Sequence, residues 1–129
     1  MALVARAQSP FTINATDTYV ITDVSDALVG TIYVCLDTTS AGTVSVVVKG
    51  RPRGIPLTTA APAFMPIPYL LLTDGGTVAA TPPEYASAAL TGDGDQILIP
   101  ATGMDIALDV TFTDGSHTVY YTKAYGASA

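Results

Sequence analysis

Residues 105–112, Asp-Ile-Ala-Leu-Asp-Val-Thr-Phe, decide the fold class of this chain, because their large apolar side chains occupy every second position. Successive side chains of a β-strand point to opposite faces, so Ile106, Leu108 and Val110 share one face. Asp105 and Asp109 share the other face. This alternation predicts a half-buried strand with Phe112 completing its apolar face, and with both carboxylates exposed to solvent.

The segments next to this strand predict a β-hairpin over residues 106–124. Thr113-Asp-Gly-Ser116 is a turn sequence, and Asp-Gly favours the tight turns that join antiparallel strands. A second strand follows from His117 to Ala124, which places His117 at an exposed strand start. A second hairpin is predicted over Val29–Lys49, with a turn at 37–42. Its first strand, residues 29–36, is apolar nearly throughout, which is typical of a strand covered on both faces.

Working outward, the rest of the chain predicts more strands and no long helix. Short β-type segments cover residues 11–13, 18–22, 67–73 and 96–100, with turn sequences about every ten residues. A length of 129 residues is that of one domain. We therefore expect an all-β, single-domain β-sandwich over residues 11–129, with an extended N-terminal arm over residues 1–10. Jelly-roll and immunoglobulin-like wiring both fit the sequence.

The composition indicates what such a sandwich contacts. Only 12% of residues are charged, against about 25% in a typical soluble domain. So few exterior charges favour a subunit that packs against neighbours. The net charge of −6 argues against nucleic-acid binding. Residues 54–73 carry no charge, but their four prolines argue against a membrane span, and the start of the chain does not resemble a signal peptide.

No group of residues predicts catalysis or a cofactor. One histidine, His117, and one cysteine, Cys35, are too few for a zinc site, and Cys35 is expected to be a small buried hydrophobic residue. Asp105 and Asp109 would lie roughly 13 Å apart along a strand, too far for glycoside hydrolysis. The segment Asp93-Gly-Asp95 is expected to be a plain turn, with a calcium site as the alternative. We expect a protein that is not an enzyme.

Three segments are candidates for contact with a partner. The first is the arm, and the second is the basic stretch 49–53, which holds three of the five basic residues of an acidic chain. That stretch is either a soluble strand end or a site that docks onto an acidic partner or a sister subunit. The third is the proline-rich connection 50–66, whose apolar residues either cap the core or form an interface. The candidate partner-binding residues are Leu3, Val4, Arg6, Lys49, Arg51, Arg53, Phe64 and Met65.

Several segments resemble the small all-β virion proteins of tailed bacteriophages, especially capsid decoration (cement) proteins. These are the extended start Met1–Pro10, Pro-Ile-Pro-Tyr at 66–69, Ile-Pro-Ala-Thr-Gly at 99–103 and Val-Tyr-Tyr-Thr-Lys at 119–123, together with the strands rich in Thr, Val and Ala. The resemblance implies a non-enzymatic protein on the exterior of the virion capsid. It also implies binding to the assembled major capsid protein, as a dimer or trimer, through arms or loops.

Two alternatives remain from the sequence. One is a small tail or fibre component of the virion. The other is a carbohydrate- or receptor-binding sandwich module, for which Tyr85, Tyr120 and Tyr125 are candidate platform residues.

Overall fold

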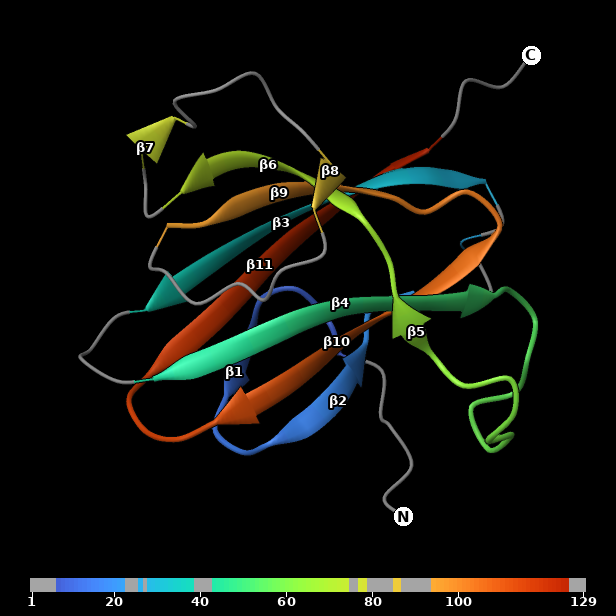
Figure 1. Cartoon of the computed structure of the whole chain (residues 1–129), viewed down its shortest axis with the longest axis horizontal. Helices are drawn as coiled ribbons and strands as arrows, with labels where there is room; N and C mark the ends of the chain where they lie inside the picture. The colour runs from blue at the N-terminus through green and yellow to red at the C-terminus, as the bar shows by residue number, and fades with distance from the viewer. Residues whose placement is uncertain are drawn as a thin grey trace.

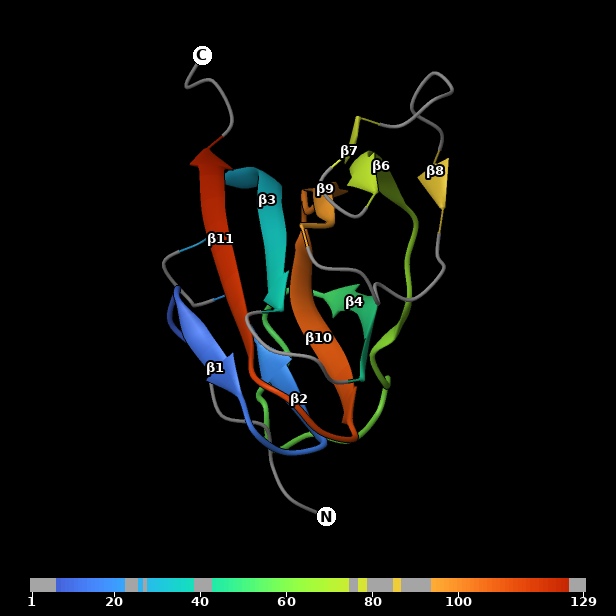
Figure 2. The same cartoon turned by 90° about the vertical axis from the view of Figure 1, so that its left-hand side faces the viewer.

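Two antiparallel sheets pack face to face in the computed structural model, which describes residues 7–22, 26, 28–38, 43–74, 77–78, 85–86 and 94–125 (Figure 1, Figure 2). Eleven strands lie within these residues. In chain order they are β1 (Phe11–Ile13), β2 (Asp17–Val20), β3 (Val29–Thr38), β4 (Val44–Pro52), β5 (Met65–Pro66), β6 (Tyr69–Asp74), β7 (Thr77–Val78), β8 (Tyr85–Ala86), β9 (Gln96–Pro100), β10 (Met104–Phe112) and β11 (His117–Tyr125). The expected β-sandwich is confirmed.

The strand order identifies the wiring as a jelly roll. The large sheet runs β1-β11-β3-β9-β6-β7, with β8 also paired to β6, and the small sheet runs β2-β10-β4-β5. Pairing is nested from the ends of the chain inward, because β1 pairs with β11, β2 with β10, β3 with β9 and β4 with β5. Such nesting is that of one long antiparallel ribbon rolled into two sheets. Strands β6 to β8 extend the large sheet beyond β9.

Both predicted hairpins are wrong, because their strands lie in opposite sheets. β10 belongs to the small sheet and β11 to the large sheet, and likewise β4 and β3 are separated. The segment after β10 crosses between the sheets, where the amide of Thr113 and the side chain of Asp114 bond to the backbone of Thr43. Only Gly115 has a positive φ there, whereas the tight Asp-Gly hairpin turn needs two such residues. Alternation identified the buried face of β10 and not its partner strand.

The core fills the space between the sheets, and the alternation predicted for residues 106–112 holds. The buried residues include Ile32, Val34 and Leu36 from β3, and Ile106, Leu108 and Val110 from β10. Burying each such side chain stabilises the fold by about 1.5–3 kcal/mol. The expectation that β3 is covered on both faces is wrong, because its residues 33 and 35 point outward. Cys35 is accordingly half-buried rather than buried.

No helix in the described ranges is long and apolar enough to cross a membrane.

Candidate functional surfaces

The basic stretch lies at the end of β4, and its central arginine is buried. Arg51 is only 5% exposed. Its Nη1 donates to the carbonyls of Thr59 (2.8 Å) and Pro62 (3.3 Å), and its Nη2 donates to those of Ile55 (3.3 Å) and Pro56 (3.1 Å). One planar guanidinium therefore holds the proline-rich connection in place. The sequence suggested that the positively charged side chain of Arg51 contacts a partner. In the structure this side chain lies inside the fold.

The other candidates around Arg51 differ in exposure. Phe64 is half-buried, with its ring centroid 4.4 Å from the Arg51 guanidinium carbon. Arg53 Nη2 donates to the carbonyl of Met104, while Arg51 Nε, Arg53 Nε and Arg53 Nη1 are buried without a hydrogen-bond partner. Met65, on the short edge strand β5, is 62% exposed. Phe64 thus packs against the fold, and Met65 remains available for contact.

The outer face of the small sheet is charged, and its charges are paired. Lys49 Nζ lies 2.6 Å from Asp109 Oδ2, across the sheet from β4 to β10. Asp105, expected at the surface, is 5% exposed, and its Oδ1 accepts a 2.9 Å bond from Thr22 Oγ1. The same hydroxyl accepts a 3.2 Å bond from the amide of Ile106. The prediction of two exposed carboxylates is therefore wrong for Asp105, because this end of the sheet face is covered.

His117 is another polar residue that the structure places inside. It is fully buried, so the expected surface position is wrong. Its Nε2 donates to the carbonyl of Asp114 (2.7 Å), its Nδ1 lies 3.1 Å from Thr38 Oγ1, and its ring packs edge-on against Phe112. His117 and Val119 are two residues apart on β11, so their side chains point to the same face of the sheet, and Val119 points inward. This two-residue spacing was the signal in the sequence that could have placed His117 in the core.

The segment before β1 is fastened across the open edge of the sandwich. The backbone amide of Tyr121 donates to Ser9 Oγ (2.8 Å), and the phenol of the same residue donates to the carbonyl of Ala7. The amide of Ala7 in turn donates to the carbonyl of Val20 (2.9 Å), so the chain bridges the large and small sheets. Phe11 stacks on Tyr19 at 4.9 Å between ring centroids and closes the same seam.

The structure describes the part of the predicted arm that lies at this seam. Ala7 and Ser9 of the arm are hydrogen-bonded to the sandwich, while Leu3, Val4 and Arg6 lie outside the described residues. Burial raises the pKa of the Tyr121 phenol above its ordinary value of 10.0, a hydrogen bond from the backbone of Ser9 to the phenol lowers it, and the carboxylate of Asp26 raises it. The net rise extends to higher pH the range in which the phenol is protonated, which is the form that donates to Ala7.

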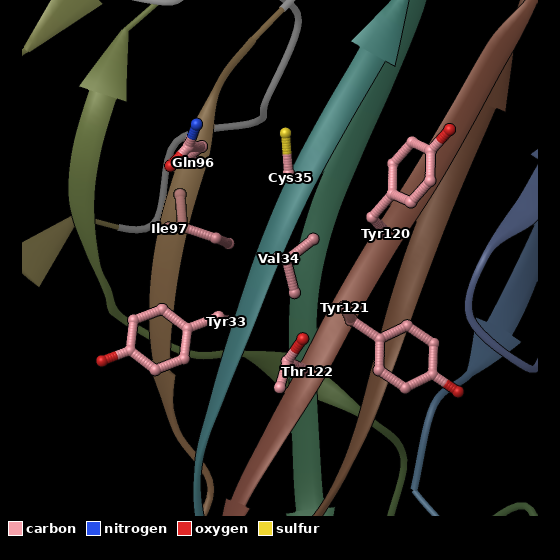
Figure 3. Close-up of a pocket in the computed structure, with 8 residues that line it drawn as sticks. All are labelled: Tyr33, Val34, Cys35, Gln96, Ile97, Tyr120, Tyr121 and Thr122. Carbon is pink, nitrogen blue, oxygen red and sulfur yellow. The ribbon is translucent and has the colours of Figure 1, made fainter.

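The outer face of the large sheet is open and uncharged at its centre. A cleft of about 120 Å³ lies there, over β3, β9 and β11 (Figure 3). Tyr33 is 48% exposed and Tyr120 is 46% exposed at this cleft. Tyr125, at the end of β11, is 59% exposed, and the side chain of Tyr85 lies outside the described part of the chain. Sequence reasoning missed Tyr33, because the apolar residues around it suggested a fully covered strand.

The described residues include no group of three or more His, Cys, Asp or Glu side chains that could hold a metal ion. Asp93, part of the calcium alternative, lies outside them. No protein-family model, no curated protein and no solved structure matches this chain.

Proposed function

We propose that this chain is a structural virion protein that binds the assembled capsid shell from its exterior and stabilises it. The observation that carries the proposal is the anchored end of the arm, at Ala7–Pro10. Tyr121 of the large sheet and Val20 of the small sheet both bond to this segment, so the chain just before β1 is held at a fixed place on the sandwich. In this proposal residues 1–6, which precede that place in the sequence, contact the shell.

Two further features support a capsid role. Jelly rolls are a common architecture of viral capsid proteins, although fold alone does not establish function. The chain is also poor in charge, with 12% charged residues, so its surface presents little electrostatic resistance to close packing. In this proposal the partners are the major capsid protein and other copies of the chain in a dimer or trimer. Many weak contacts on a lattice then give strong overall attachment.

Co-sedimentation with phage capsids assembled without this chain tests the proposal. We expect saturable binding of the full chain at a fixed ratio to the major capsid protein. Deleting residues 1–6 should weaken binding at least about tenfold, because it removes the residues to which the proposal assigns contact with the shell and leaves the bonds of Ala7 and Ser9 intact. Circular dichroism and a thermal melt confirm that the shortened chain keeps its fold.

The matched control is Tyr120→Ala, which changes the outer face of the large sheet and leaves the arm intact. This variant should bind capsids as the full chain does. Absence of binding to capsids would overturn the proposal, and binding to tails or fibres instead would favour the tail-component alternative. Equal binding with and without residues 1–6 would overturn the role of the arm.

A further inference from the structure

Exposed aromatic rings gather on one pair of strands. Tyr33, Tyr120 and Tyr125 are the exposed aromatic residues of the described chain, and all three lie on β3 and β11 of the large sheet. The register places Tyr33 opposite Thr122 and Cys35 opposite Tyr120. Tyr33 and Tyr120 are therefore diagonal neighbours on the same outward face, about 7–8 Å apart at their backbones.

The two rings flank the cleft rather than filling it. Figure 3 shows the ring of Tyr33 over β9 and the ring of Tyr120 on the other side of β3, with Cys35 of β3 on the side that faces Gln96. Both rings are seen face-on in that view. Gln96 of β9 is opposite Cys35 in the register and completes the cleft on this side. The site is thus a shallow, open depression with aromatic faces at two of its sides.

The lining of the cleft offers no charged partner to a ligand. None of the eight residues that line the cleft is charged, and the chain as a whole has a net charge of −6, which disfavours anions. No carboxylate lines the cleft to attract a cation. A ligand at this site is therefore held by apolar contact and by hydrogen bonds, without an ion pair.

The polar groups narrow the ligand class further. The amide of Gln96 both donates and accepts hydrogen bonds, and so does the hydroxyl of Thr122. Aromatic faces favour flat apolar surfaces, whereas these two groups favour hydroxyls. A saccharide combines both, because one face of a sugar ring presents C–H groups and its edge presents hydroxyls. An open cleft also admits part of a longer chain, which an enclosed pocket would exclude.

We propose that this cleft binds a neutral saccharide, with Tyr33 and Tyr120 stacking on sugar rings and Gln96 and Thr122 bonding to hydroxyls. The activity goes beyond capsid attachment and uses a separate surface. The neighbouring Tyr121 points its phenol to Ala7 at the seam, so the two sites share strand β11 and differ in the face they use. A second copy of the chain packed on this face is the competing occupant that the test must separate.

A glycan array that carries neutral and anionic saccharides tests the proposal with the full chain. We expect binding to neutral glycans only. For the neutral hits, titration of soluble oligosaccharide should give weak, saturable binding, and Tyr33→Ala or Tyr120→Ala should each lower the affinity about tenfold or more. Tyr120→Phe, which keeps the ring, should retain most of the affinity. Tyr125→Ala is the matched control, because this exposed ring lies outside the cleft, and it should change the affinity less than twofold.

Cys35 supplies a second readout, because it is the single cysteine of the chain and lines the cleft. Saturating saccharide should slow its alkylation by iodoacetamide in the native chain, and should not do so in Tyr120→Ala. Absence of binding to every neutral glycan, binding to anionic glycans alone, or an equal loss in Tyr125→Ala would overturn the proposal. A dimer in analytical ultracentrifugation that Tyr120→Ala dissociates would also overturn it, and would assign the face to a second copy. None of these outcomes depends on capsid binding.

Discussion

The outer faces of the two sheets are built from the same kind of strand and have opposite chemistry. On the small sheet, the outward residues of β4 and β10 include Lys49, Arg51, Asp105 and Asp109, and each is paired with or covered by another part of the chain. On the large sheet, the outward residues of the central strands β3 and β11 are uncharged at the cleft, and two tyrosine rings there are about half exposed.

The difference separates a face that holds the fold together from a face that is left for contact. Charged groups taken from water must find partners within the protein, because an unpaired buried charge costs several kcal/mol. The small sheet meets this requirement with the loop carbonyls around Arg51 and the hydroxyl of Thr22. The large sheet has no such requirement at its centre, so its side chains can be exchanged at little cost to stability.

The largest effect on stability should come from replacing Arg51, the buried arginine of the small sheet. Arg51→Met keeps much of the side-chain volume and deletes the donors to four carbonyls and the contact with Phe64. Hydrogen bonds to a charged group contribute about 1.5–3 kcal/mol, so we expect a loss of about 3 kcal/mol in the free energy of unfolding. Urea titration measures it. Limited proteolysis with thermolysin should then cleave within residues 53–64.

Arg53→Met is the matched control for this comparison. Arg53 is two residues further along, and its Nη2 bonds to the carbonyl of Met104 while its Nε and Nη1 have no hydrogen-bond partner. Its loss should cost about 1 kcal/mol and leave the proline-rich connection resistant to protease. Equal destabilisation by the two substitutions would contradict the assignment of Arg51 as the residue that fastens this loop.

The sequence was sufficient to predict the fold class and much of the core. Strict alternation in residues 106–112 placed Ile106, Leu108 and Val110 correctly, because the period of a strand depends on local geometry alone. The pairing of strands was not predictable in the same way. A turn such as 113–116 joins two strands of one sheet or of opposite sheets, and the choice depends on which distant strand buries the same core. Jelly-roll nesting is therefore a property of the whole chain.

The candidate sites were harder to predict, for a related reason. A run such as Lys-Gly-Arg-Pro-Arg identifies charge and gives no information about what covers it. Arg51 is buried because a connection up to eleven residues away in sequence folds back and offers its carbonyls. Tyr33 was missed because its neighbours are apolar, although it alternates with Ile32 and Val34 and so points to the opposite face of β3. Alternation along the strand was the usable signal in both cases: it indicates an outward side chain for Tyr33 and an inward one for His117.

A smaller effect, which depends on pH, is expected at the seam between the sheets. Burial raises the pKa of Tyr121 in the folded chain, so folding favours the protonated phenol. The stability that this proton contributes is present below pH 10 and is lost as the pH rises from there through the higher pKa of the folded state. Tyr121→Phe should cost about 1 kcal/mol at pH 8, because the bond to Ala7 is lost. Its stability should then fall less steeply than that of the native chain between pH 10 and pH 11.5.

Urea unfolding at a series of pH values measures this difference. The pKa values of Tyr19 and Tyr69 are also raised by burial, but both residues are present in each chain, so their effect cancels in the comparison. Tyr120→Phe, at an exposed position on the same strand, serves as the control and should follow the native curve. Parallel curves for the native chain and Tyr121→Phe would show that the phenol does not lock the start of the arm.

The smallest effect on stability should come from the open face of the large sheet. Tyr33→Ala and Tyr120→Ala each remove a ring that is about half exposed and that contributes through cross-strand contacts with Thr122 and Cys35. Such pairs contribute about 0.2–1 kcal/mol, so each substitution should lower the free energy of unfolding by less than about 1 kcal/mol. Urea titration beside Arg51→Met compares the two faces directly. A loss of about 3 kcal/mol for either tyrosine would mean that the large sheet depends on its outer rings as the small sheet depends on Arg51. The two faces would then not differ in role, because a ring needed for folding cannot be attributed to contact alone.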